Sequence, residues 1–173
     1  LADIENGTLH IDMEAEDIHT FIEGELTKRI GDNGKRLHTS RSRNDQVAVD
    51  IKLYLKKEVV NVKNLVVGLI KVIADKAEKY SETVMPGYTH LQRAQPITFG
   101  HHLLAYGEML LRDVSRLEDC LKRMDEMPLG SCALAGKTYP IDRTITAELL
   151  GFDRITNNSL DGVSDRDYCI EFA

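Results

Sequence analysis

The feature that most constrains the fold is the long stretch from Asp45 to Tyr80, which contains no proline and only one glycine, Gly68. Its apolar residues recur at the three- and four-residue spacing of an amphipathic α-helix. The main stripe consists of Val47, Ile51, Tyr54, Leu55, Val59, Val62, Leu65, Val66, Leu69, Ile73 and Tyr80. A thinner stripe on the opposite side consists of Val49, Leu53, Val60 and Val67. The pattern therefore predicts one continuous helix with apolar residues on two sides.

A helix of this length is too long for one compact domain. At 1.5 Å per residue it spans about 54 Å. A compact globule of 173 residues has a radius of gyration of about 16 Å, and hence a diameter of about 40 Å. We therefore expect the helix to pack against helices of other subunits as well as those of its own chain.

The other segments favour helices too, and the sequence predicts an all-α fold, an elongated bundle of long helices. A first helix runs from about Met13 to Ile30, with Asp12 as its cap and Gly31 closing it. Pro86-Gly87 and Pro96 predict a loop over residues 81–97, and a second long helix follows over about 98–124. No run alternates cleanly enough to predict a sheet.

The last third of the chain is broken into shorter pieces. Small residues predict a loop over 130–136, and a short helix follows over 140–150. Ser164 and Asp167 form a variant capping box, which predicts a last helix that continues to the end of the chain.

Composition excludes several classes of protein. The hydrophobic and charged fractions, 42% and 29%, are ordinary for a globular protein. A net charge of −6 argues against a nucleic-acid partner, which would need a basic surface. No apolar run reaches the length that spans a bilayer, and no charged-then-apolar leader is present, so we expect no membrane partner.

The cysteines indicate a reducing compartment. Cys120, Cys132 and Cys169 are widely spaced and form no CxxC pair. This usage argues against a disulfide framework and against a zinc site. We therefore expect a cytoplasmic protein.

Both ends of the chain look like cuts. The chain begins with Leu1 rather than Met, and its last residues, 169–173, lie inside an apolar-periodic run without a Gly or Pro stop signal. We expect a piece of a longer protein, with a processed mature chain as the alternative.

The first cluster with chemical potential is Thr39-Ser40-Arg41-Ser42-Arg43-Asn44-Asp45, at the start of the long helix. Free backbone N–H groups and the helix dipole favour anions there, and arginine side chains match carboxylates. The alternative is an ordinary helix start, with Ser42 or Asn44 as the cap and the arginines in solvent. Spacing alone leaves both interpretations open.

The second cluster is Gly87-Tyr88-Thr89-His90-Leu91-Gln92-Arg93-Ala94-Gln95-Pro96. A histidine in a loop bounded by Gly and Pro can be held rigidly, and its pKa suits proton transfer near neutral pH. Thr89 and Gln92 offer neutral hydrogen bonds to a substrate. Spacing alone favours the alternative, a loop histidine bonded to backbone.

Together, and in this order around a long helix, the two clusters resemble the first two conserved blocks of the fumarase/aspartase superfamily, most specifically of the argininosuccinate lyases. Residues 39–46 (TSRSRNDQ) are similar to the first block, and residues 87–96 (GYTHLQRAQP) to the second. Residues 16–20, 129–136 and 159–172 are also similar to this family. One departure is Cys132, where small glycine-like residues are usual, and we expect no catalytic consequence from it.

The resemblance implies a homotetramer with a central bundle of long helices. Residues 1–43 would then be part of an N-terminal helical domain, and residues 44–173 part of the central bundle. The implied reaction is the reversible cleavage of argininosuccinate to arginine and fumarate, without a metal or an organic cofactor. It passes through a carbanion beside a carboxylate, which calls for fixed cationic and hydrogen-bond donors.

Site residues follow from the matching motifs. The resemblance implies proton transfer for His90, substrate binding for Asn44 and Thr89, and a hold on substrate carboxylates for Ser42 and Arg43. It also implies supporting roles for Asp17, His19 and Arg166. Taken alone, His19 falls among Ala15, Ile22 and Leu26 on a helical wheel, which favours a core histidine, and Arg166 is equally consistent with an exposed helix start.

A third conserved block of the family, a loop with a catalytic serine and a lysine, is absent from the 173 residues. We therefore expect the chain by itself to be inactive. The two present clusters lie at opposite ends of the long helix, roughly 50 Å apart. One small substrate cannot touch both, so we expect a second, antiparallel subunit to complete the site.

Three alternatives remain. An adenylosuccinate lyase is disfavoured by Arg41, Arg43 and Gln92. A structural protein of the delta-crystallin kind would share the fold and the motifs without catalysis. A helical assembly module would bind no ligand at all.

Overall fold

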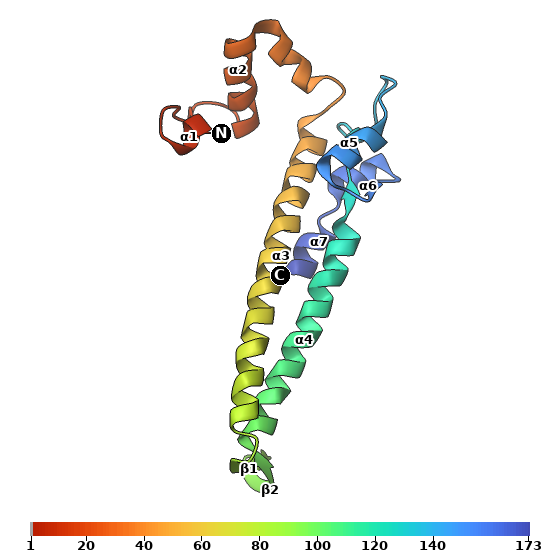
Figure 1. Cartoon of the computed structure of the whole chain (residues 1–173). Helices are drawn as coiled ribbons and strands as arrows, with labels where there is room; N and C mark the ends of the chain where they lie inside the picture. The colour runs from red at the N-terminus through yellow and green to blue at the C-terminus, as the bar shows by residue number, and fades with distance from the viewer. Residues whose placement is uncertain (1) are drawn as a thin grey trace.

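Two long antiparallel helices form the body of the protein in a computed structural model, which describes residues 2–173. Helix α3 (Arg43–Lys79) and helix α4 (Phe99–Met124) lie side by side along most of their length (Figure 1). They are joined at one end by a hairpin of strands β1 (Val84–Thr89) and β2 (Gln92–Thr98). The predicted elongated bundle of long helices is confirmed.

Local signals fix where the long helices begin. Ser42 is the N-cap of α3, and Asp45 completes a capping box by accepting the Ser42 N–H. The Thr98 hydroxyl caps α4 by accepting the His101 N–H. At the far end of the pair, a Cβ on Gly100 would lie 2.4 Å from the carbonyl oxygen of Ala77, so only glycine permits this close approach of α4 to α3.

The core between the elements consists of two apolar clusters. The first lies near the start of α3 and centres on Val49, Met127, Ala147 and Phe152. The second lies farther along the pair and centres on Val59, Cys120, Met124 and Tyr168. Helix α7 (Asp167–Phe172) contributes Tyr168 by packing on α4, as Figure 1 shows.

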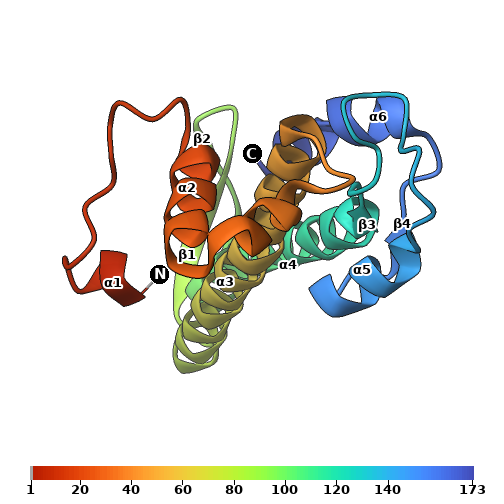
Figure 2. The same cartoon turned by 90° about the horizontal axis from the view of Figure 1, so that it is seen from above.

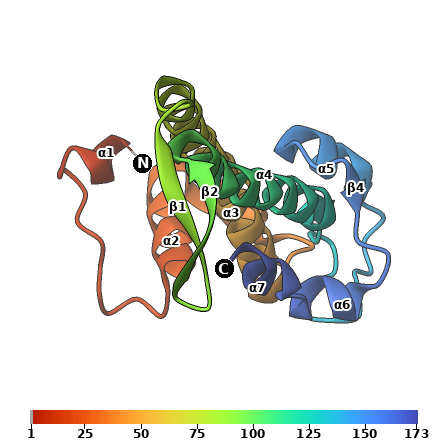
Figure 3. The same ribbon diagram turned by 90° about the horizontal axis from the view of Figure 1, so that it is seen from below.

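The hairpin corrects one expectation, because residues 81–97 were predicted as a loop and no sheet was expected. Strands β1 and β2 pair antiparallel, with Thr89 opposite Gln92 and Val84 opposite Thr98. Pro86 and Pro96 face each other in this register and hide the strand pattern in the sequence. Figure 3 shows the hairpin at the end of the bundle.

The first predicted helix is shorter in the structure than in the prediction. Helix α1 (Ala2–Glu5) is followed by a segment of turns and bends, and α2 (Ile18–Ile30) begins at the Asp17 cap, whose side chain accepts the Thr20 N–H. The predicted start at Met13 with Asp12 as cap is therefore wrong, while Gly31 does end the helix. A 3-10 helix, η1 (Gly31–His38), then leads to α3, and Figure 2 shows α1 and α2 beside the helix pair.

The C-terminal third packs on one side of the helix pair, near the start of α3. Short strands β3 (Glu126–Met127) and β4 (Arg154–Ile155) pair in parallel, and α5 (Arg143–Leu150) lies between them in sequence. Helix α6 (Ser159–Ser164) was not predicted. The predicted Ser164–Asp167 box is wrong, because the Ser164 hydroxyl bonds back to Leu160 and Asp161 inside α6, and α7 has no side-chain cap.

Within residues 2–173, no helix has the length and apolar character needed to cross a membrane. The division into domains at residues 43 and 44 stays a prediction.

Candidate functional site

The structure places the two sequence clusters at opposite ends of α3. Ser42, Arg43 and Asn44 lie at its first turn, whereas Thr89 and His90 lie in the hairpin beyond its last turn (Figure 1). The 37 residues of α3 span about 55 Å. The clusters do not meet within one chain, as the sequence predicted.

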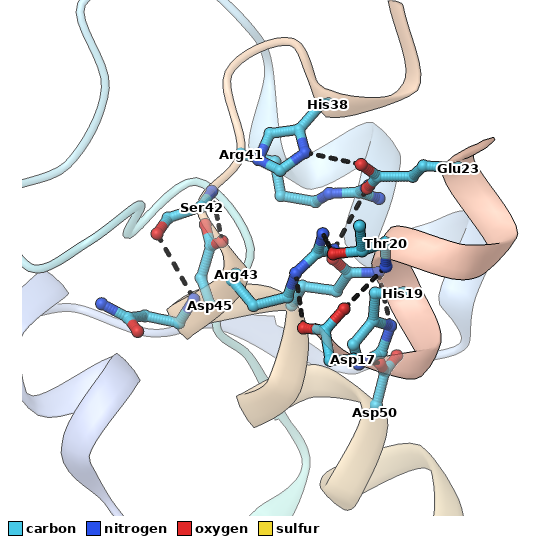
Figure 4. Close-up of polar contacts among 12 residues, drawn as sticks. Asp17, His19, Thr20, Glu23, His38, Arg41, Ser42, Arg43, Asp45 and Asp50 are labelled. Atoms are coloured by element: carbon cyan, nitrogen blue, oxygen red, sulfur yellow. Dashed lines mark hydrogen bonds and ion pairs between the residues drawn. The ribbon is translucent and has the colours of Figure 1, made fainter. Parts of the chain in front are cut away.

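At the start of α3, Glu23 of α2 gathers three basic side chains. Its carboxylate accepts from Nη2 of Arg41 at 2.8 Å and Nη1 of Arg43 at 3.1 Å, and it lies 2.9 Å from Nδ1 of His38 (Figure 4). Burial raises the pKa of this carboxyl, but hydrogen bonds and charges of His38 and Arg43 outweigh it and lower the pKa to about 2. Sequence reasoning missed Glu23. Its position one helical turn after His19 was the available signal.

Arg43 is held by the same helix. Besides Glu23, its guanidinium contacts Oδ2 of Asp17 at 3.0 Å and Oγ1 of Thr20 at 3.3 Å, and it donates to Gln46. Figure 4 shows this side chain turned toward α2. The carboxylates that Arg41 and Arg43 bind in this structure are therefore those of the protein, and the alternative of arginines in solvent is wrong.

Ser42 serves as the helix cap, which was the simpler of its two sequence interpretations. Its hydroxyl accepts the Asn44 N–H at 3.3 Å. The side chain is thus committed to the start of α3, next to the cavity described below.

His19 faces α3 and makes polar contacts. Its Nε2 lies 3.4 Å from Asp50, and its Nδ1 lies 3.0 Å from Nε2 of Gln46. The side chain is 17% exposed. Burial raises the pKa of Asp50, and the charge of His19 opposes this shift. Both ring nitrogens thus have partners, as expected of a satisfied core histidine, and the supporting role of His19 stays a prediction. Asp17 and His19 both lie in the network that holds Arg43 and Gln46.

Asn44 and Arg166 meet at one cavity of about 270 Å³, lined by Arg43, Asn44, Val47, Val163 and Arg166. The Asn44 amide donates to the carbonyl oxygen of Ala133 at 3.2 Å. Arg166 donates through Nη1 to the carbonyl oxygens of Val163 and Asp165. The cavity therefore combines guanidinium and amide donors with two apolar walls, an arrangement suited to a small anionic ligand.

His90 occupies the tip of the hairpin. His90 and Leu91 have φ values of 52° and 62°, which make a two-residue turn of the type that usually demands asparagine and glycine. Both side chains are exposed, Leu91 at 98%. Thr89, next to it, lines a cavity of about 450 Å³ between the hairpin and α4. The turn thus holds an exposed imidazole in a strained backbone, a feature that clusters at functional sites.

Comparisons with known proteins show the family to which the chain belongs. A family model described as "Lyase" matches residues 1–173. The chain belongs to this lyase family. Argininosuccinate lyases of Desulforamulus reducens and Heliobacterium mobile are 59% and 61% identical to it over 172 residues, 99% of the chain. The chain spans 37% and 38% of the length of these relatives.

Solved structures agree with the lyase family. EDDS lyase in complex with formate superposes with a TM-score of 0.87 at 32% identity, covering 99% of this chain and 33% of that one. An EDDS lyase variant with bound fumarate gives the same values. A fumarate lyase:delta crystallin from Brucella melitensis shares the fold, with a TM-score of 0.76 at 22% identity over 88% of this chain and 37% of that one. The predicted resemblance and the fumarase/aspartase-like fold are confirmed.

Among the described residues, no group of three or more His, Cys, Asp or Glu side chains is arranged to hold a metal ion.

Proposed function

We propose that this chain supplies part of an argininosuccinate lyase, which reversibly eliminates fumarate from argininosuccinate to release arginine. The observation that carries this proposal is the identity of 59% and 61% with argininosuccinate lyases over 99% of the chain. The cavity that joins Asn44 to Arg166 supports it, because a dicarboxylate product needs fixed donors.

In the proposed reaction, a base removes the proton from the carbon beside a carboxylate of the succinate part. The electron pair forms the double bond of fumarate as the bond to the guanidinium nitrogen breaks. The leaving nitrogen keeps the electrons of that bond and takes up a proton, which gives the positively charged guanidinium group of arginine. We assign His90 to proton transfer, directly or through a group that it orients, and Thr89 and Asn44 to hydrogen bonds with the substrate. No cofactor has a part in these steps.

One chain cannot place both Asn44 and His90 on the same substrate molecule, because they lie at opposite ends of α3, about 55 Å apart. We therefore propose an antiparallel second subunit whose Thr89 and His90 lie beside Asn44 of the first. A homotetramer, as the sequence resemblance implies, provides such pairs. The protein acts in the cytoplasm in this proposal.

The test is a hybrid enzyme, in which this chain replaces the matched 172 residues of the Desulforamulus reducens relative. We expect the hybrid to form fumarate from argininosuccinate, followed by its ultraviolet absorbance, and not from adenylosuccinate. We expect the 173-residue chain by itself to form none, since its sequence contains no counterpart of the serine- and lysine-bearing block. A folded hybrid without activity would count against the proposed function and leave a structural role.

His90→Asn in the hybrid tests the proton-transfer role. Asparagine accepts the left-handed backbone of this position, so the turn should persist. We expect kcat to fall by about 10²-fold or more, with little change in melting temperature. Leu91→Asn is the matched control, because it occupies the adjacent left-handed position without removing the imidazole. A loss that appears mainly as unfolding would make His90 structural.

A further inference from the structure

We propose that Asp45 is a positioning residue of the lyase site, which fixes the loop over residues 130–133 and through it the amide of Asn44. The proposal rests on the proposed function for its kinetic consequence, but its structural part stands without it. Asp45 belongs to the first sequence cluster, but the sequence alone gives its carboxylate no role.

Asp45 is 0% exposed and accepts backbone N–H groups both from the start of its own helix and from one distant segment. Its Oδ1 accepts the N–H of Ser42 at 2.9 Å. Its Oδ2 accepts the N–H groups of Gly130 at 3.0 Å and Cys132 at 2.8 Å. Hydrogen bonds to a buried carboxylate are stronger than those between neutral groups. One side chain therefore fastens the loop to the first turn of α3.

Arg143 of α5 holds the segment that leads into this loop through carbonyl groups of that segment. Its guanidinium donates to Leu129 O at 2.7 Å and Met127 O at 3.2 Å, and also to the backbone and hydroxyl oxygens of Thr156. Gly130 has a φ of 89°, which favours glycine, and a Cβ there would lie 2.9 Å from the Arg143 side chain. The Asp45 carboxylate thus accepts N–H groups of the loop, and the Arg143 guanidinium donates to C=O groups of the residues just before it.

The loop held in this way reaches the cavity. The Ala133 carbonyl oxygen, one residue after Cys132, accepts the Asn44 amide at 3.2 Å. An asparagine amide has a second N–H and a carbonyl oxygen, which this contact orients for a ligand in the cavity. Asn44 and Asp45 are adjacent in the first turn of α3. Asp45 fixes the loop, and the loop in turn orients the Asn44 amide through Ala133.

The test begins with Asp45→Asn. Asparagine keeps the size of the side chain but replaces one accepting oxygen with a donor, so at least one of the three backbone N–H groups loses its partner. Nitrogen-15 NMR of the 173-residue chain reports the side-chain amide of Asn44. We expect its signal to shift and its hydrogen exchange to accelerate by about tenfold or more. In the hybrid enzyme we expect kcat/KM to fall by about 10- to 100-fold at a temperature where the protein is folded.

Val59→Ala is the stability-matched control. Val59 is 0% exposed in the second core cluster, away from the loop. This variant should lower the melting temperature and leave both the Asn44 amide and kcat/KM unchanged. Arg143→Lys is a second variant for the case in which Asp45→Asn does not fold. It loosens the segment over residues 127–129 that leads into the loop, and it should reproduce the changes in the Asn44 signal and in kcat/KM.

An unchanged Asn44 amide in folded Asp45→Asn and Arg143→Lys proteins would overturn the proposal. So would a fall in kcat/KM that only follows the loss of melting temperature, equal for Val59→Ala and the loop variants. An inactive hybrid would reject the proposed lyase function alone, because the NMR comparison still decides whether Asp45 positions Asn44.

Discussion

At the scale of single residues, backbone strain gathers at the proposed site. The non-glycine residues with positive φ among those described are Ser40, His90, Leu91 and Cys132. Ser40 and Cys132 touch each other near the start of α3, where the Cys132 thiol lies 3.6 Å from the Ser40 carbonyl oxygen. His90 and Leu91 form the hairpin turn at the other end. Both proposed halves of the site therefore contain backbone that most residues avoid.

Cys132→Gly should stabilise the protein. The left-handed backbone at φ 54° is unfavourable for cysteine and open to glycine, which gives a physical reason for the small residues usual at this position. We expect the free energy of unfolding to rise by about 0.5–1 kcal/mol, because the relief of strain exceeds the extra chain entropy of glycine. Urea unfolding at neutral pH measures it. Cys132→Ala, which keeps the strain and removes the thiol, should show no such gain.

At the scale of elements, the long helices were predicted with accurate bounds and the short ones less completely. Helices α5 and α7 correspond to predicted short helices, although α5 begins later than predicted and the predicted cap of α7 is wrong, and α6 was missed. The signals for α3 and α4 are local, since their apolar spacing and their caps at Ser42 and Thr98 lie within a few residues. The start of α2 was misplaced because Asp12 and Asp17 are equivalent cap candidates in sequence, and only Asp17 bonds into the helix. The hairpin was missed because each of its strands contains a proline, which in a sequence argues against a strand. The strands form only because they pair with each other.

The same distinction holds for the site. Both motif clusters were visible, because each is continuous in sequence. The partners of Asp45 were not visible, since Gly130 and Cys132 are 85 and 87 residues away. The role of Glu23 was equally hidden, because its arginines lie on a different element and meet it only when α2 docks on α3.

Glu23→Gln should weaken the docking of α2 in a pH-dependent way. The pKa of Glu23 is lowered from 4.5 to about 2 in the folded protein. A carboxyl with a lowered pKa contributes stability above its unfolded pKa, and this contribution is lost as pH falls from about 4.5 toward about 2. We expect the urea midpoint of the variant to lie below that of the original at pH 6, and the gap to narrow progressively from pH 5 to pH 3.

Glu25→Gln provides the comparison for this experiment, because Glu25 lies on the same helix and its one ion pair within residues 2–173 is with Lys28, at 2.6 Å. The urea midpoint of Glu25→Gln should lie only slightly below that of the original protein, and the difference should be nearly constant with pH, because the single partner Lys28 is 74% exposed. If the difference in urea midpoint for Glu23→Gln were also constant with pH, the Glu23 carboxylate would not be the ionised partner of His38, Arg41 and Arg43.

At the scale of the whole molecule, the helix pair exposes apolar side chains along its length. On α3, Tyr54 is 64% exposed and Leu65 is 74% exposed, while Leu69 and Val72 are each 50% exposed. On α4, Leu104, Tyr106, Met109 and Leu111 are about half exposed. Scattered apolar residues are normal on a surface, but contiguous stripes on long helices mark contact with other chains.

We therefore expect the 173-residue chain to self-associate. Sedimentation equilibrium at micromolar concentration should give a mass of at least twice 19.5 kDa. Changing Leu65 and Leu69 together to Glu should shift the mass toward the monomer, because the two side chains are one helical turn apart on the exposed stripe. Lys57→Glu, at an exposed polar position of the same helix, is the control. A clean monomer for the original chain would reject the interface.

The last prediction concerns the shared site, and it follows from the length of α3. Since Asn44 and His90 lie at opposite ends of this helix, each proposed site takes Asn44 from one subunit and His90 from another. Subunits with different lesions should then rescue each other when they mix. We would co-express hybrid subunits carrying Asn44→Ala with hybrid subunits carrying His90→Asn, and isolate the mixed tetramers with two different tags. Random assembly in equal amounts leaves roughly a quarter of the sites with both original side chains, while an equal share receives both lesions. Activity should therefore return to roughly a quarter of the unmodified hybrid, well above either single variant. Tetramers verified as mixed but no more active than the single variants would contradict the shared site. They would show instead that Asn44 and His90 do not act on one substrate.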